Sequence, residues 1–201
     1  MRPVIDYYLA PQSPWTYLGH QRFADLARAA GAAIRVRPVD LGGKVFPVSG
    51  GLPLARRAPQ RQAYRLVELA RFSAHLGVPL NLHPAHFPVA ADDAARLIVA
   101  VDQADGADAA MRITGALLRA VWAEQRNIAD AQELAAVLGA CGLPSTRLDE
   151  ARAPAVQARY DADTQRAIEA GVFGAPTYVV DGEMFWGQDR LDFLERRLNA
   201  H

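Results

Sequence analysis

The stretch VFGAPTYVVDGEMFWGQDR, residues 172–190, contains two short strands and the turn between them. Thr177–Val180 is rich in β-branched residues and is therefore predicted to be a strand. Asp181-Gly182 is a dipeptide that favours a tight hairpin turn, so Glu183–Trp186 is expected to be the returning strand. Ala175-Pro176 stands at the entrance to the first strand, where proline is tolerated. The rarity of cis bonds favours a trans peptide there, and a cis bond is the alternative.

Helical patterns lie on both sides of this hairpin. Apolar residues recur at helical spacing over residues 155–170 and again over residues 188–198. Gly171 suits the end of the first helix, because glycine adopts the left-handed conformation that often terminates a helix. The C-terminal part of the chain is therefore predicted to be α-β-β-α.

The N-terminal part predicts a complementary unit. Val4–Leu9 (VIDYYL) combines β-branched and aromatic residues, which is typical of a strand. Ser13 and Pro14 favour a helix start, because serine caps helices and proline fits the first helical position. Helical spacing continues to Gly31, and residues 33–37 (AIRVR) alternate as a strand does. The order β-α-β is the unit that builds a parallel pair of strands.

The middle of the chain is predicted to be mainly helical. Residues 39–59 are rich in glycine and proline and are expected to form a long loop, whereas residues 60–76 return to helical spacing. The other expected segments are an irregular stretch over residues 78–88, three helices over residues 92–141 with breaks near Gly106 and Asn127, and a short helix over residues 144–151.

Together these patterns predict an α/β domain built from both ends of the chain, residues 1–55 and 153–201. Residues 56–152 are predicted to form an all-helical insertion between them. A chain of 201 residues, 51% of them hydrophobic, has enough apolar material for such a core.

The composition argues against several classes of protein. Lys+Arg and Asp+Glu both number 22, so the net charge is zero, which argues against nucleic acid or an anionic membrane as partner. No apolar run reaches the roughly 18 residues of a membrane-spanning helix, and the start lacks the apolar stretch of a signal peptide. Because Cys141 is the one cysteine, neither an intrachain disulfide nor a zinc site with two cysteines can form. We therefore expect a cytoplasmic protein without a metal.

Several conspicuous residues receive a structural interpretation. His20, His75 and His83 are expected at the surface or in loops, since none has a partner at metal-ligand spacing. Trp122 occupies an apolar helix position and is predicted to lie in the core. Cys141 is interpreted as a small buried hydrophobic residue.

Ser13 and Asp189 are the candidate functional residues that the pattern itself indicates. A helix that begins after a strand presents free N–H groups and a positive dipole end, which favour an anion such as a thiolate. Ser13 stands at such a start, although an ordinary N-cap is the simpler interpretation when the residue is taken alone. Asp189 is placed to cap the last helix, and Gly187 allows close approach of another group. An ordinary cap with a surface ion pair is the alternative there.

Two longer stretches carry a resemblance to a known family. IDYYLAPQSPWTYLG (residues 5–19) and ARYDADTQRAIEAGVFGAPTYVVDGEMFWGQDRLDFLE (residues 158–195) resemble the opening and closing segments of the 2-hydroxychromene-2-carboxylate isomerases. The layout is similar to that of the disulfide oxidoreductase DsbA and the kappa-class glutathione transferases. FGxPT followed by WGxDR is specific, whereas Ser-Pro-aromatic alone is not. The resemblance implies an α/β fold, a thioredoxin-like domain with an all-helical insertion.

The resemblance also implies a site for glutathione as cofactor. Ser13 would lie beside the glutathione sulfur and favour its thiolate, and the backbone of Ala175 would pair with the cysteinyl part before a cis Pro176. The implied glutathione-binding set is Ser13, Pro14, Trp15, Ala175, Pro176, Trp186, Gly187, Gln188 and Asp189. The implied substrate-binding set is Lys44, Arg56, Arg57 and His86.

The implied activity is that of a glutathione-dependent cis-trans isomerase. It would convert 2-hydroxychromene-2-carboxylate, or a related ring-opened aromatic, to a trans-o-hydroxybenzylidenepyruvate type product through reversible thiolate addition. No cysteine stands at position 13, 14 or 16, so a dithiol redox cycle lacks both of its thiols.

Two alternatives stay open. One is a kappa-class-like glutathione transferase or peroxidase, and the other is a non-catalytic thioredoxin-like binding module. The implied partner is a small aromatic carboxylate substrate. Relatives of this kind are commonly dimers, so the resemblance also allows a homodimer.

Overall fold

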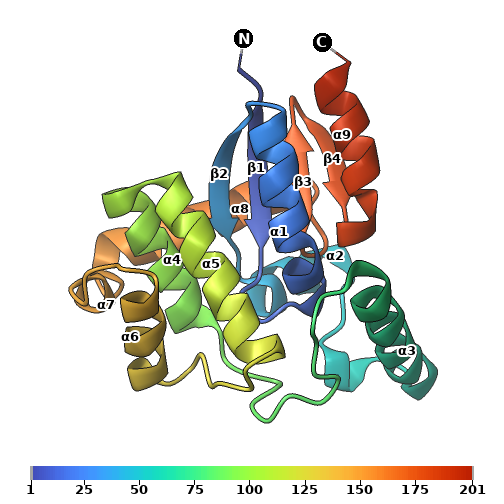
Figure 1. Cartoon of the computed structure of the whole chain (residues 1–201), viewed down its shortest axis with the longest axis horizontal. Helices are drawn as coiled ribbons and strands as arrows, with labels where there is room; N and C mark the ends of the chain where they lie inside the picture. The colour runs from blue at the N-terminus through green and yellow to red at the C-terminus, as the bar shows by residue number, and fades with distance from the viewer. Residues whose placement is uncertain (1, 201) are drawn as a thin grey trace.

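The computed structural model describes residues 2–200 and is built around a four-stranded sheet (Figure 1). The strand order is β2-β1-β3-β4, and β1 (Val4–Leu9) is parallel to β2 (Ala33–Pro38). β3 (Thr177–Val180) runs antiparallel to β1 and to β4 (Glu183–Trp186). Both residues of the turn between β3 and β4 have positive φ, as the Asp-Gly dipeptide favours. The predicted parallel pair and the predicted hairpin are therefore confirmed.

An aromatic cluster joins the centre of the sheet to α1 (Pro14–Ala29). Tyr7 on β1 stacks on Tyr178 on β3, with 5.4 Å between ring centroids. Phe23 on α1 lies 4.6 Å from the Tyr7 ring and 4.5 Å from the Tyr178 ring. All three side chains are fully buried, so they fix α1 across the middle strands.

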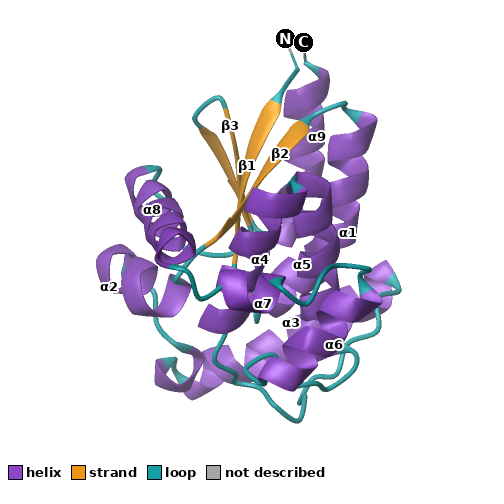
Figure 2. Cartoon of the chain, turned by 90° about the vertical axis from the view of Figure 1, so that its left-hand side faces the viewer, coloured by secondary structure: helices purple, strands orange, loops and turns teal. Residues whose placement is uncertain are grey.

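Helices cover both faces of the sheet. Figure 2 shows α8 (Pro154–Glu169) on one face and α1 with α9 (Leu191–Asn199) on the other. The fully buried carboxylate of Asp163 on α8 pairs with Arg37 on β2, and it also accepts a hydrogen bond from Arg159 Nε at 2.6 Å. This buried charge cluster holds α8 against the sheet.

The segment between β2 and α8 is mainly helical, as predicted. In Figure 1, α4 to α7 lie to one side of the sheet and α3 lies below it. Their bounds are α3 (Pro59–Leu76), α4 (Asp92–Asp105), α5 (Ala107–Trp122), α6 (Ala131–Ala140) and α7 (Arg147–Glu150). Gly106 separates α4 from α5 as predicted, and Trp122 is fully buried as predicted. The division into units 1–55 with 153–201 and 56–152 stays a prediction. Within residues 2–200, no helix is long and apolar enough to cross a membrane.

The expectation of one long loop over residues 39–59 is wrong. The segment forms a π-helical turn at Leu41–Val45, then α2 (Phe46–Ser49), then a 3-10 turn at Leu54–Arg56. The Asp40 carboxylate accepts a hydrogen bond from the Gly43 N–H at 2.7 Å and so caps the first turn. Glycine here ends a short helix rather than preventing one, since Gly50, with a φ of +76°, is the C-cap of α2.

The prediction that His20 lies at the surface is also wrong. Its ring nitrogens lie 3.1 Å from Tyr7 Oη and 3.0 Å from the Met111 carbonyl oxygen. Burial lowers the pKa of His20 to about 4. Gly115 on α5 provides the space, because a Cβ at that position would lie 3.1 Å from the His20 ring.

The last helix begins later than predicted, and Asp189 is not its N-cap. A 3-10 turn (Gln188–Arg190) precedes α9, whose N-cap is Arg190 without a side-chain capping bond. Asp189 therefore does not cap α9, and its carboxylate instead accepts a hydrogen bond from Arg190 Nη1 at 2.6 Å. His75 and His83 are exposed as predicted, whereas Cys141 is only partly buried.

Candidate active site

Ser13 links the start of α1 to the entrance of β3. It is the N-cap of α1, and its Oγ accepts a hydrogen bond from the Thr16 N–H at 3.2 Å. The same hydroxyl donates to the carbonyl oxygen of Ala175, 3.4 Å away. Ser13 is thus both a helix cap and a buried hydroxyl donor at the positive end of a 16-residue helix.

Polar groups around Ser13 lack partners. Gln12 Oε1 and Thr16 Oγ1 are buried and have no hydrogen-bond partner in the described chain. The backbone N–H groups of Trp15 and Ala175 likewise bond to no other described residue. Because buried polar groups in native proteins are nearly always hydrogen-bonded, this cluster indicates a place for a polar ligand.

The peptide between Ala175 and Pro176 is cis, as the family resemblance implies and contrary to the trans bond that the pattern alone favours. The Pro176 carbonyl oxygen accepts a hydrogen bond from the Gly187 N–H at 2.9 Å. Gly187 has a φ of +104°, which glycine adopts readily and other residues rarely do. This bond ties the segment after β4 to the entrance of β3.

On the same segment the Trp186 side chain is exposed, whereas the Gln188 side chain is buried. The Trp186 ring lies 4.7 Å from the Phe173 ring, and the residue is 49% exposed. A Cβ at Gly174 would lie 2.2 Å from Trp186 Nε1, so the close approach requires glycine. Gln188 is buried, and its Oε1 accepts a hydrogen bond from Arg22 Nη1 on α1 at 3.1 Å.

Lys44, Arg56 and Arg57 make no hydrogen bond or ion pair with the described residues around Ser13. Lys44 Nζ donates to Asp161 Oδ1 on α8 at 2.6 Å, and this contact raises the pKa of Lys44. Arg57 Nε donates to the Leu52 carbonyl oxygen at 2.8 Å, whereas the Arg56 side chain is exposed. No hydrogen bond or ion pair among the described residues joins Lys44 to either arginine.

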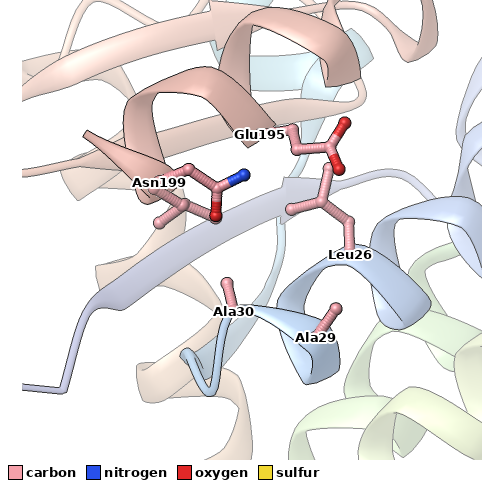
Figure 3. Close-up of a pocket in the computed structure, with 6 residues that line it drawn as sticks. Leu26, Ala29, Ala30, Glu195 and Asn199 are labelled. Atoms are coloured by element: carbon pink, nitrogen blue, oxygen red, sulfur yellow. The ribbon is translucent and has the colours of Figure 1, made fainter. Parts of the chain in front are cut away.

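His86 lines an open pocket of about 350 Å³ beside the loop that leads to α4. The other residues lining it are Ala85, Phe87, Pro88, Val89, Ala90, Asn127 and Ala129. Figure 3 shows a smaller cavity, about 80 Å³, between the end of α1 and α9. The length of α1 places that cavity roughly 24 Å from Ser13. It has room for only a few water molecules and is not part of the site.

Sequence reasoning missed the contribution of α3. Phe72 on α3 packs edge-on against Trp15, with 6.0 Å between ring centroids. Arg65 lies two turns earlier on α3, against the rings of Phe87 and Trp122. Arg65, Leu69 and Phe72 are spaced so that they share one face of the helix. This spacing could have indicated that Arg65 and Phe72 face the interior together with Leu69.

The chain is similar to known proteins over nearly its whole length. The family model for the DSBA-like thioredoxin domain matches residues 4–199. A 2-hydroxychromene-2-carboxylate isomerase of Sphingobium xenophagum is 34% identical over 98% of this chain and 99% of its own. The protein of the same name from Pseudomonas putida is 31% identical over 96% of this chain and 92% of its own.

Solved structures share the fold. The structure of a 2-hydroxychromene-2-carboxylate isomerase matches with a TM-score of 0.79 and 29% identity, over 98% of this chain and 95% of that one. The cytosolic disulfide reductase DsbM from Pseudomonas aeruginosa, solved with GSH, matches with a TM-score of 0.68 and 19% identity, over 98% and 99%. The second match shows the fold alone. The predicted thioredoxin-like fold with a helical insertion is confirmed.

Proposed function

Because the chain belongs to the DSBA-like thioredoxin-domain family, and within it to the 2-hydroxychromene-2-carboxylate isomerases, we propose that it isomerises 2-hydroxychromene-2-carboxylate or a related ring-opened aromatic. The proposed product is of the trans-o-hydroxybenzylidenepyruvate type, and glutathione is the proposed cofactor. The observation that carries the proposal is the Ser13 hydroxyl at the N-terminus of α1, in contact with the Ala175 carbonyl oxygen. The Ser13 hydroxyl donor and the positive end of the α1 dipole therefore lie at the same position, where the chain has no cysteine.

Glutathione fits the polar groups around Ser13. The unpartnered atoms include acceptors, such as Gln12 Oε1, and donors, such as the Ala175 N–H, and a tripeptide offers complements to both. The partly exposed carboxylate of Asp189 suits an α-ammonium group, and Trp186, three residues earlier in the chain, offers an exposed apolar surface. When bound, glutathione supplies a thiolate that can add to a conjugated carbon and leave again.

Ser13 is the residue that would hold the sulfur as an anion. A free thiol has a pKa of about 8.5, and lowering it by about two units requires about 2.7 kcal/mol in favour of the thiolate. A hydrogen bond to a charged acceptor contributes about 1.5–3 kcal/mol, and a helix N-terminus contributes about 0.3–1 kcal/mol. The 3.4 Å contact of Ser13 with the Ala175 carbonyl oxygen is long, so the hydroxyl is available to a better acceptor.

Arg56, Arg57 and His86 stay the proposed contacts of a small aromatic carboxylate. Lys44 belongs to the same proposed set and would leave its 2.6 Å contact with Asp161 to reach a substrate. We also propose that the protein is cytoplasmic and that it forms a homodimer. Size-exclusion chromatography with light scattering tests whether the dimer forms.

The first experiment is glutathione binding, followed by the ultraviolet difference band of the thiolate. The wild type should show the band at neutral pH, and Ser13→Ala should lose it, because the hydroxyl donor is removed. Ser145→Ala is the matched control, since Ser145 is exposed in the turn before α7. Absence of the band from the wild type at millimolar glutathione would contradict the cofactor, and an unchanged band in Ser13→Ala would contradict the role of Ser13.

The second experiment measures turnover of 2-hydroxychromene-2-carboxylate together with the concentration of glutathione. An isomerase leaves the glutathione concentration unchanged, because the cofactor is recovered in each cycle. A fall in glutathione with a conjugate or a disulfide as product would instead indicate the transferase or peroxidase alternative. Glutathione binding without turnover of any tested aromatic would favour the binding module.

A further inference from the structure

One face of α3 borders the proposed site and carries a charged residue. Arg65, Leu69 and Phe72 lie on that face, because residues four and seven apart in a helix point the same way. Leu69 is fully buried, and Phe72 packs against Trp15, two positions after Ser13. Arg65 lies two turns before Phe72, about 10 Å away along the helix axis.

The guanidinium of Arg65 lies against two aromatic rings from other segments. Its Cζ is 5.3 Å from the centroid of the Phe87 ring and 5.7 Å from that of the Trp122 ring. These two rings are themselves in contact, 4.8 Å apart. Both distances to Arg65 are within the range of a cation–π interaction, so the rings orient the guanidinium and shield it from water.

No carboxylate among the described residues pairs with this guanidinium. Arg65 has no hydrogen bond or ion pair with any of residues 2–200. Burial, and after it the positive charge of Arg57, lower the pKa of Arg65 to about 10. Trp122 Nε1 is also buried without a partner in the described chain. Two neighbouring donors, the Arg65 guanidinium and Trp122 Nε1, thus make no hydrogen bond to an acceptor of the described chain.

Among the other buried or half-buried arginines of the described chain, carboxylate partners are the rule; Arg57, which donates to the Leu52 carbonyl oxygen, has none. Buried Arg37 pairs with Asp6 at 2.6 Å, and Arg147 pairs with Asp105 at 2.7 Å. Burying a cation without a partner is costly, and proteins normally avoid it. Arg65 and its neighbour Arg57 depart from this rule, which indicates a position whose anion comes from outside the chain.

We propose that Arg65 determines substrate specificity by binding the carboxylate of the substrate, with Arg57 adding positive charge beside it. This inference rests on the proposed isomerase function and names the group that selects an anionic substrate. A guanidinium binds a carboxylate through two parallel N–H···O bonds, and the shielding by Phe87 and Trp122 strengthens such a pair. In this proposal the carboxylate of the substrate contacts Arg65, and its aromatic part lies along α3 between Arg65 and Trp15.

The test compares two probes that differ in charge. trans-Cinnamate, an aromatic carboxylate, and its neutral amide are each titrated into the full-length protein with glutathione present, and binding is measured by calorimetry. The wild type should bind the carboxylate at least about tenfold more tightly than the amide. Arg65→Gln should remove this preference and raise the KM for the substrate by about the same factor. Equal affinity of the wild type for both probes would overturn the proposal.

Arg71→Gln is the matched control, because Arg71 lies on the same helix, is exposed and is already paired with Glu68 at 2.7 Å. It should keep the preference for the carboxylate. Arg65→Met is a second test variant, since a flexible apolar side chain can fill the space between the rings and preserve the fold. It should lose the preference as Arg65→Gln does, and a preference retained in either Arg65 variant would overturn the proposal.

The thiolate band distinguishes this inference from the proposed function. Both Arg65 variants should keep the band, because no interaction among the described residues joins Arg65 to Ser13. A wild type that lacks the band but prefers the carboxylate would refute the cofactor and leave the role of Arg65 standing. A wild type that shows the band without any preference for the carboxylate would refute the role of Arg65 alone.

Discussion

Replacing Gly19 with alanine should destabilise the protein, whereas the same replacement at Gly139 should stabilise it. Both glycines lie inside helices, Gly19 in α1 and Gly139 in α6, and neither has a positive φ. Alanine is favoured over glycine in a helix interior by about 0.5–1 kcal/mol. Helix propensity alone therefore predicts a gain in stability at both positions.

Packing reverses the sign at Gly19. A Cβ there would lie 2.8 Å from Gln188 Cβ, 3.3 Å from Gln188 Cα and 3.2 Å from Tyr178 Oη. Both neighbours are buried, and the Gln188 atoms are backbone or next to it, so they cannot rotate away. Overpacking of this kind costs about 1–3 kcal/mol, which leaves a net loss of about 1 kcal/mol. A Cβ at Gly139 would meet nothing within 4 Å, so the gain remains there.

Thermal unfolding followed by circular dichroism measures both effects. A change of 1 kcal/mol shifts the Tm of a domain of this size by about 2–4 °C, so Gly19→Ala should lower the Tm by about that amount. Gly139→Ala should raise it by up to the same amount. Because Gln188 lies between Gly187 and Asp189, Gly19→Ala should also weaken glutathione binding. An equal rise in Tm for both variants would refute the packing argument.

Two further predictions concern buried ionisable groups. Asp163→Asn should lower the free energy of unfolding by about 3–5 kcal/mol, because Arg37 and Arg159 keep their charges and lose a fully buried carboxylate. Urea denaturation measures this, and a loss below about 1 kcal/mol would contradict it. Burial holds the pKa of His20 at about 4, below the value of about 6.5 for an unfolded chain, so the unfolded state binds the proton first as the pH falls. The stability contributed by neutral His20 is complete above about pH 6.5 and is lost toward pH 4. His20→Gln should reduce the difference in unfolding free energy between pH 7 and pH 5, and an unchanged difference would be inconsistent with this assignment.

Elements with strong local signals are predictable from the sequence alone. The bounds of β3 and β4 agree with the prediction because the dipeptide Asp181-Gly182 determines the turn and therefore the register of both strands. The start of α1 agrees because Ser13 and Pro14 are both favoured at the positions where the structure has them. The contact between Ser13 and Ala175, by contrast, was predictable only through the family resemblance, because it joins segments 162 positions apart.

Residues whose surroundings come from distant helices are not predictable from local spacing. His20 is buried because Gly115 on α5 leaves room for its ring. Lys44 is held by Asp161, 117 positions later, and no local pattern indicates that ion pair. Arg65 has the helical spacing of a core-facing residue, but its position against Phe87 and Trp122, with no carboxylate partner among residues 2–200, follows only from the three-dimensional structure.

The positions of Ser13 and Cys141 favour the proposed use of a thiol that a ligand brings in. Cys141, the one cysteine, is the C-cap of α6, where the negative end of the helix disfavours a thiolate, and burial raises the pKa of its thiol. Ser13 occupies the positive end of α1, where the dipole and the hydroxyl both favour an anionic sulfur. Disulfide exchange needs two thiols at that end, and the chain has none there. Reversible addition needs only one thiolate, held and then released, which is the task that the geometry at Ser13 can perform.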